Sequence, residues 1–378
     1  MLNLRAGACK VPITPSEPVF LAGFGQNRRS IGVHDDIFAR CLALEKGGES
    51  IRIVSLDLIG LFNEDVREIR SCSSFENTIV ACTHVHSGPD TLGLWGPSSD
   101  VSGVDQDYME FLKKNVLECI GKAVSEMRDA KISFGTVSAH GISKNVRNRR
   151  SLDSDLIVAK IEDARGGTIA TITNFACHPE VLGNDNTLVT SDFPGFACNY
   201  VEREIGGCAI YLNGAIGGMV TPDVHEGNFE MAERIGSLVG KKTIEAVDCA
   251  EPQEEPSLSL RRSTVKLPLE NEVFLELQRK GVLQREIHEG QLTTEVTVAK
   301  VASAEFVTIP GEAFPNLGLE LKRNMRARYR FVLGVAEDEL GYIMQESDFG
   351  LELYKYEQSM SVGPKTWPIL VETLAKLL

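Results

Sequence analysis

The sequence predicts an α/β fold in which mixed β-sheets are flanked by helices and form one large catalytic domain. Apolar runs of strand length alternate with segments of helical spacing along the 378-residue chain, a pattern typical of mixed α/β architectures. A hydrophobic content of 43% with 24% charged residues fits a soluble globular protein. The one break in composition, at 250–257, is interpreted as a surface connection within a single unit spanning 1–378, because a candidate site residue lies beyond it.

The predicted strands are short apolar runs. Before the surface connection they are expected at 38–44, 51–56, 78–82, 156–160, 168–175 and 208–212. Apolar residues spaced three and four apart predict helices over 108–127, 231–246 and 368–378. Beyond the connection we expect strands at 293–300 and 304–309, followed by a helix over 315–326 whose first turn holds a proline.

Charge and apolar length limit the partners that the chain can have. A formal net charge of −14 argues against nucleic acid or an anionic membrane as the main partner, since both need a basic surface. No apolar stretch approaches the roughly 18 residues that span a bilayer, and the N-terminus lacks the apolar region of a secretory signal. We therefore expect a cytoplasmic protein without stable membrane insertion. The nine cysteines are scattered, which indicates free buried thiols.

The most informative segment is Ala81-Cys-Thr-His-Val-His-Ser-Gly-Pro-Asp90, where a predicted buried strand ends at two histidines and a turn. Side chains two apart in an extended backbone point to the same side, so His84 and His86 are predicted to face one cavity. Two imidazoles at the open end of a rigid strand suggest a metal site or an acid/base pair. The alternative is that one or both histidines only satisfy backbone carbonyls.

Two further strand ends present residue types that bind metals. The segment Asn174-Phe-Ala-Cys-His-Pro-Glu180 presents His178, and the segment Val307-Thr-Ile-Pro-Gly-Glu312 presents Glu312. Glu312 also precedes a helical pattern, where a carboxylate often serves only the helix dipole. Around zinc, two histidines and a glutamate leave an open position for water, whose pKa zinc would lower to about 7.

Three other segments carry weaker signals. Tyr211-Leu-Asn-Gly-Ala-Ile-Gly-Gly-Met-Val-Thr-Pro222 is a strand followed by glycines, which suit a close backbone approach to a ligand or N–H donors better than nucleotide binding. Asn145-Val-Arg-Asn-Arg-Arg150 is either solvated surface or a site for a substrate carbonyl or carboxylate. The tyrosines of 341–344 and 354–357 are interpreted from their chemistry as half-buried packing residues.

Taken together, these segments resemble the catalytic domain of the neutral/alkaline non-lysosomal ceramidases, which are zinc-dependent amidases. Thr83-His-Val-His-Ser-Gly-Pro89 is similar to the family's Thr-His-Thr-His-Ser-Gly-Pro motif and is the most specific match. Gly7-Ala-Cys-Lys-Val-Pro-Ile-Thr14 looks like the family's opening, and Phe175-Ala-Cys-His-Pro179 and Ile309-Pro-Gly-Glu312 look like its later motifs. The likeness runs nearly end to end, and the order of the motifs carries it.

The resemblance implies a site for one zinc ion per chain. The positions that match the family's zinc ligands are His84, His178, Glu312 and the tyrosine of the Gly-Tyr motif, Tyr342.

The resemblance also implies three residues that face the substrate. His86 would face the substrate and not the metal. The arginine of the family's Asn-Arg pair corresponds best to Arg149, with Arg147 as the alternative. The second family tyrosine corresponds to Tyr356, with Tyr354 as the alternative.

Three departures from the family pattern bear on the substrate. The chain ends soon after the tyrosine motifs, so we expect no C-terminal immunoglobulin-like domain. The stretch between His178 and Glu312 is short for the family. The family's Gly-Asp-Val-Ser-Pro turn is Gly218-Met-Val-Thr-Pro222 in this chain. We therefore expect the chemistry to transfer better than the substrate.

The sequence thus predicts a zinc-dependent hydrolase that cleaves a small-molecule N-acyl amide of lipid-like character. Zinc-bound hydroxide would attack the carbonyl, while His86, Arg149 and Tyr356 stabilise the oxyanion and His86 protonates the departing amine. The alternatives are a metal-dependent ester or phosphoester hydrolase on the same ligands, and a non-catalytic binding protein with this fold. An amidohydrolase barrel also carries His-x-His, but the order of the motifs fits it less well. Acyl length, the amine and the oligomeric state are left open.

Overall fold

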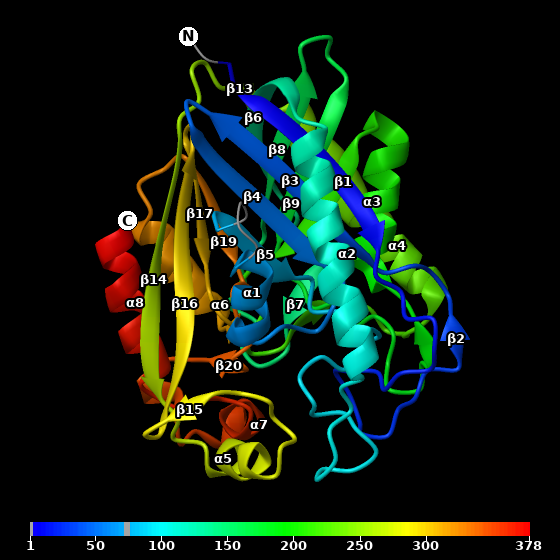
Figure 1. Cartoon of the computed structure of the whole chain (residues 1–378), viewed down its shortest axis with the longest axis vertical. Coiled ribbons are helices and arrows are strands. Elements are labelled where there is room, and N and C mark those ends of the chain that lie inside the picture. The colour runs from blue at the N-terminus through cyan, green and yellow to red at the C-terminus, as the bar shows by residue number, and fades with distance from the viewer. Residues whose placement is uncertain (1–2, 72–75) are drawn as a thin grey trace.

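The computed structural model describes residues 3–71 and 76–378, which form two packed β-sheets with helices on their outer faces (Figure 1). The first sheet consists of β1 (Arg5–Pro12), β3 (Phe38–Lys46), β4 (Glu49–Leu56), β5 (Thr78–Cys82), β6 (Arg128–Ser138), β8 (Asp155–Asp163), β9 (Thr168–Phe175), β11 (Cys208–Asn213) and β13 (Glu251–Pro252). Its strand order is β11-β9-β8-β6-β1-β3-β4-β5, with β13 paired to β6.

The second sheet is built from the part of the chain beyond 257. It consists of β14 (Leu258–Pro268), β15 (Ile287–His288), β16 (Gln291–Val301), β17 (Ala304–Thr308) and β19 (Tyr329–Leu333). The order is β14-β16-β17-β19, and β15 pairs with β16.

Helices cover the outer face of each sheet. The first sheet carries α2 (Gln106–Ser125), α3 (Asp192–Ile205) and α4 (Phe229–Asp248). The second sheet carries α6 (Pro315–Asn324) and α8 (Thr366–Leu377) on the opposite side of the molecule (Figure 1). The shorter α1 (Asn63–Ser71), α5 (Glu272–Arg279) and α7 (Lys355–Ser359) lie near the lower half of the view.

The two sheets share one hydrophobic core. Alternate residues of β8, Ile157, Ala159 and Ile161, point to the same side as expected for a strand, and they belong to a buried cluster that includes Phe306 and Phe331 of the second sheet. The mostly exposed segment 250–257 therefore connects two halves of one core. A single domain of mixed sheets flanked by helices is confirmed. Residues 343–378 form η1 (Glu346–Asp348), η2 (Glu352–Tyr354), α7 and α8, and no immunoglobulin-like sandwich.

Three parallel strand pairs bring their carboxyl ends together. These pairs are β4–β5, β9–β11 and β17–β19. Two buried asparagines connect the ends: the side-chain amide of Asn213 donates to the Thr83 carbonyl at 2.7 Å, and that of Asn174 donates to the Val332 carbonyl at 3.0 Å. Because ligand sites of α/β sheets lie at the carboxyl ends of strands, this meeting point positions the site.

Every strand and helix named from the sequence is present, with small differences at its ends. The longer elements that were not predicted include the strands β1, β6, β14 and β19 and the helices α1, α3 and α5. In β14, polar residues such as Arg261 and Arg262 interrupt the apolar pattern, since much of this strand is only partly buried. The helix α3 holds Pro194 and Gly195 near its start, and proline is tolerated in a first turn.

The eight cysteines that the structure describes are all free, and six are buried. Among the described helices, none has the length and apolar character that crossing a bilayer requires.

Candidate metal centre and pocket

His84 follows β5 in a strained backbone conformation. Its φ of +67° lies in the left-handed region, which costs a non-glycine residue energy and recurs at functional sites. The Nδ1 atom lies 2.6 Å from the Ile59 carbonyl oxygen, to which it donates a hydrogen bond. The Nε2 atom is then left as an acceptor or ligand, and it lies 3.5 Å from Oε1 of Glu312.

His178 follows β9 and repeats this arrangement. Its Nδ1 donates to the Val220 carbonyl at 2.9 Å, and its Nε2 lies 2.8 Å from Oε2 of Glu312. The side chain is completely buried. A backbone carbonyl that holds Nδ1–H and turns Nε2 toward a shared centre is the usual support of a metal-binding histidine.

Glu312 is positioned by backbone pairing. The short strand β18 (Glu312–Ala313) pairs in parallel with β20 (Tyr342–Ile343), and Glu312 is the register partner of Tyr342. Burial acts to raise the pKa of Glu312, but His84 and His178, together with a hydrogen bond from the Tyr342 hydroxyl, lower it. Gly217 lies against the backbone of Glu312, where an added Cβ would meet the Glu312 carbonyl oxygen at 2.3 Å. The glycine-rich turn therefore serves a backbone-to-backbone contact here.

His86 lies beside the other two histidines. The candidate ligand nitrogens of His84, His86 and His178 all lie within 4.8 Å of one another. Both ring nitrogens of His86 are buried without a hydrogen-bond partner among the described residues, and Nδ1 is 3.7 Å from a carboxylate oxygen of Glu180. The ring packs edge-on against Phe24. The expectation that His86 faces the substrate stays a prediction, since its position suits either role.

This group of side chains fits a divalent cation. Burial lowers the pKa of His84 to about 4. Burial also acts to lower the pKa of His178, but the carboxylates of Glu180 and Glu312 raise it to about 9. Both Nε2 atoms face the Glu312 carboxylate, and a single proton on one of them leaves the other without a hydrogen to share with it. A cation between the two Nε2 atoms and the carboxylate would satisfy all three, and zinc accepts this ligand set.

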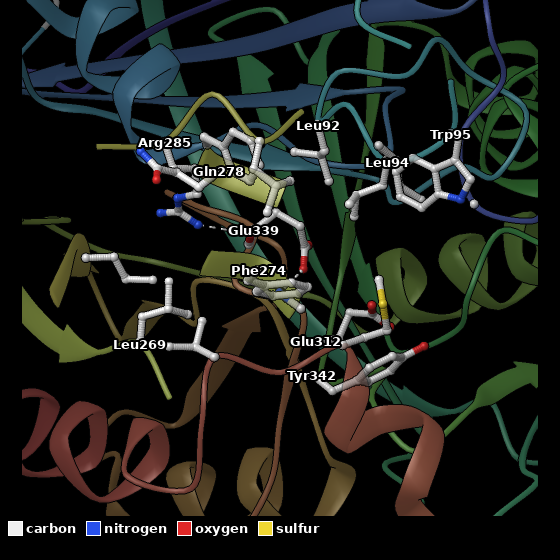
Figure 2. A pocket seen from close by; sticks show the side chains of 18 of the residues that line it. Leu92, Leu94, Trp95, Leu269, Phe274, Gln278, Arg285, Glu312, Glu339 and Tyr342 are labelled. Carbon is white, nitrogen blue, oxygen red and sulfur yellow. Dashed lines mark hydrogen bonds between the residues drawn. The ribbon is translucent and has the colours of Figure 1, made fainter. Parts of the chain in front are cut away.

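The histidines open onto a largely apolar pocket with an empty volume of about 800 Å³, which includes its open mouth. His84, His86, Glu312 and Tyr342 form one part of its wall. Figure 2 shows apolar side chains from several segments around the same cavity. They include Leu92, Leu94 and Trp95 after the histidine motif, Leu269 after β14, and Phe274 on α5.

Glu339 is a wall residue that was not singled out from the sequence. It is 6% exposed, and burial raises its pKa well above the usual value. One carboxylate oxygen accepts from the Gly341 amide at 2.8 Å, and the other has no hydrogen-bond partner among the described residues. A signal was present, because Glu337, Asp338 and Glu339 are three consecutive acidic residues directly after an apolar strand.

Of the two candidates for the second tyrosine, Tyr356 lies in the pocket wall. Tyr356 lines the pocket and is 48% exposed, and its ring centroid lies 5.9 Å from that of Tyr342. Tyr354 packs on Phe314 instead.

Neither arginine of the predicted pair lines the pocket. Arg149 is exposed, and Arg147 donates to the fully buried carboxylate of Glu357 at 2.7 Å. The substrate contact of Arg149 stays a prediction.

Comparisons with known proteins show the family of the chain. The family model for neutral/alkaline non-lysosomal ceramidase, N-terminal, matches residues 5–220. The chain is 23% identical over 227 residues to the neutral ceramidase of Drosophila melanogaster and 20% identical over 229 residues to that of Pseudomonas aeruginosa. These matches cover 53% and 54% of this chain but 32% and 34% of those proteins, so the chain spans about a third of their length.

Two solved structures share the fold. The crystal structure of neutral ceramidase from Pseudomonas aeruginosa aligns with a TM-score of 0.83 at 18% identity, over 99% of this chain and 74% of that one. A ceramidase complexed with C2 aligns with a TM-score of 0.84 at 17% identity over the same shares.

Proposed function

The chain belongs to the neutral/alkaline non-lysosomal ceramidase family, and on this premise we propose that it is a zinc-dependent hydrolase that cleaves an N-acyl amide bond. The observation that supports this most is the convergence of His84 and His178 on one carboxylate of Glu312, at the wall of an apolar pocket. The cytoplasmic location expected from the sequence stays a prediction.

The proposed zinc ligands are His84, His178, Glu312 and Tyr342. Bound zinc would supply a Lewis acid that polarises an amide carbonyl and lowers the pKa of a water molecule. The chain holds these ligands rigidly, because each histidine has its Nδ1 fixed by a backbone carbonyl and Glu312 is fixed by its strand pairing.

His86 is the proposed group for proton transfer. Its unpartnered ring nitrogens lie beside the other two imidazoles, within reach of a substrate held there. In this role His86 takes a proton from the attacking water and passes it to the amine nitrogen as the C–N bond breaks. Its backbone carbonyl accepts a hydrogen bond from the buried Arg28, whose guanidinium lies 4.9 Å from the ring centroid of Phe24. These contacts fix the loop that carries the ring.

The apolar wall defines the rest of the proposed substrate. Leu92, Leu94, Trp95 and Phe274 offer contact surface for the hydrocarbon part of an N-acyl amide, and burial of each methylene contributes about 0.8 kcal/mol. Tyr356 lines the pocket and is 48% exposed, which supports its proposed role as a substrate contact. An apolar acyl chain is therefore the substrate feature that this wall supports best.

The test is hydrolysis of N-acyl amides of graded chain length by the zinc-loaded protein, next to matched esters and phosphate monoesters. We expect turnover of the amides that increases with chain length, and its loss in His84→Ala. The control is His288→Ala, because this side chain is 80% exposed. Preferential turnover of the esters or phosphates, or full turnover by His84→Ala, would contradict the proposal.

A further inference from the structure

We infer that Glu339 makes the pocket selective for ligands that carry a protonated amine close to the scissile amide. This inference deepens the proposed hydrolase function and rests on it for the identity of the reaction. It names a substrate class that the apolar wall alone does not define.

Among the residues that the structure describes, Glu339 differs from its two acidic neighbours in having no lysine or arginine that pairs with its carboxylate. Glu337 pairs with Arg70 at 2.7 Å, and Asp338 pairs with Arg285 at 2.7 Å. Arg285 also donates to the backbone carbonyl of Glu339, at 3.4 Å. The outer oxygen of the Glu339 carboxylate is left without a hydrogen-bond partner among residues 3–71 and 76–378, although the residue is only 6% exposed.

The backbone around Glu339 is shaped to hold its side chain in the pocket wall. A Cβ added at Gly60 would lie 2.7 Å from Cβ and 2.8 Å from Cγ of Glu339, so a glycine is needed there. Figure 2 shows the Glu339 side chain near Arg285 and Phe274 in the wall of the cavity. The carboxylate is therefore a positioned feature of the pocket.

Glu339 does not serve to orient His84. Its free oxygen is 3.9 Å from Nδ1 of His84, and that nitrogen already donates to the Ile59 carbonyl at 2.6 Å. On the other side of the same ring, Nε2 faces Glu312 at 3.5 Å. One imidazole thus separates the free carboxylate from the proposed metal centre, which places a bound amine within a few bonds of the scissile amide.

The unpartnered carboxyl group of Glu339 explains the selectivity. An apolar wall without a cation disfavours its ionised form, and a ligand ammonium would supply that cation and form charge-assisted hydrogen bonds with it. A ligand carboxylate would bring no cation, and a ligand hydroxyl would form a hydrogen bond without charge.

The first experiment measures binding without turnover. Calorimetric titration of the zinc-loaded protein with dodecylammonium and dodecanol compares two head groups on one hydrocarbon chain. We expect roughly tenfold tighter binding of the ammonium than of the alcohol. Glu339→Gln should remove the preference, because glutamine keeps an acceptor for Gly341 and loses the charge.

Glu272→Gln is the matched control, since this carboxylate is exposed on α5. Equal affinity for ammonium and alcohol in the wild type, or an unchanged preference in Glu339→Gln, would overturn the inference.

The second experiment separates this inference from the proposed function. It compares kcat/KM for dodecanoyl amides of ethylenediamine, ethanolamine and ethylamine. The ratio of kcat/KM for the ethylenediamine amide to that for the ethylamine amide should fall roughly tenfold in Glu339→Gln. An unchanged ratio would contradict the inference. Absence of turnover for all three amides in the wild type would refute the proposed hydrolase, while the calorimetric preference would still decide the role of Glu339.

Discussion

Glu312 and Tyr342 are register partners in the parallel pair β18–β20, although they lie in different segments of the chain. This backbone pairing places the Tyr342 hydroxyl near the carboxylate that faces His84 and His178. The same hydroxyl contacts the sulfur of Met219 at 3.8 Å, in the turn whose sequence departs from the family pattern. Main-chain contacts therefore position all four proposed ligands, since backbone carbonyls hold the two histidines and strand pairing holds Glu312 and Tyr342.

Zinc content tests the proposed ligands directly. We expect one zinc ion per chain in the wild type, and strongly reduced zinc in His84→Ala and His178→Ala because each variant removes an Nε2 donor. Elemental analysis of dialysed protein gives the stoichiometry, and thermal unfolding shows whether each variant is folded. His288→Ala should keep its zinc, since this ring is exposed. Full zinc in both folded ligand variants would exclude the site.

Tyr342→Phe separates ligation from packing. Phenylalanine keeps the ring contact with Tyr356 and removes only the hydroxyl beside Glu312. If the hydroxyl supports the metal, zinc affinity should fall roughly 10–100-fold, as measured by competition with a chromogenic chelator. Tyr354→Phe is the matched control, because Tyr354 packs on Phe314 away from the histidine pocket. Equal zinc affinity in the two variants would show that Tyr342 only packs.

Gly217→Ala should destabilise the protein through the backbone of Glu312. The added Cβ would lie 2.3 Å from the Glu312 carbonyl oxygen, and relief of such a clash costs about 1–3 kcal/mol of unfolding free energy. Gly121→Ala should have the opposite sign, because that position in α2 has no atom within 4 Å of the added Cβ and alanine is favoured in a helix by about 0.5–1 kcal/mol. Urea unfolding measures both, and equal effects would contradict the proposed contact.

Asp192→Asn should change how stability depends on pH. Burial raises the pKa of Asp192 to about 7, against the hydrogen bonds that its carboxylate accepts from Phe193 and Leu182. A carboxyl whose pKa is higher in the folded state binds its proton more tightly there. Its contribution is therefore complete below the ordinary pKa of 3.8 and is lost as pH rises toward 7. Asparagine cannot titrate. As pH rises through this range, the unfolding free energy of the variant should therefore increase relative to that of the wild type by up to ~1.4 kcal/mol per pH unit.

Urea unfolding of both proteins at roughly pH 4 and pH 8 measures this difference. Asparagine tolerates the left-handed backbone at this position, where φ is +51°. A difference between the two proteins that is the same at both pH values would show that Asp192 titrates normally in the folded state.

The local elements were largely predictable because their signals are local. The strand at 78–82 has the predicted bounds, since an uninterrupted apolar run of this length packs on both faces of a sheet. The helix α3 was missed because its start contains Pro194 and Gly195, which periodicity alone counts as breakers. Partial exposure hid β14, since its side chains follow no clean alternation.

The candidate site was predictable in part. The histidines and Glu312 were found because each follows an apolar strand at a turn, and the structure brings all three together. The arginine run at 147–150 left both a surface and a substrate role open, and the choice of Arg149 came from the resemblance. The structure places Arg149 outside the pocket wall. Glu339 had a signal in its run of acidic residues, but only the lack of an arginine partner among the described residues distinguishes it from Glu337 and Asp338.

The sequence by itself determined most of the strands and helices and the candidate residues that stand at their ends, because backbone propensity and side-chain periodicity act over a few residues. Only the tertiary structure decided that the ends of β5, β9 and β17 meet, and that Tyr342 pairs with Glu312. The physical reason is that strand order and sheet packing depend on contacts between segments far apart in the chain. These contacts also decide which buried charges find partners, as the isolated carboxylate of Glu339 shows.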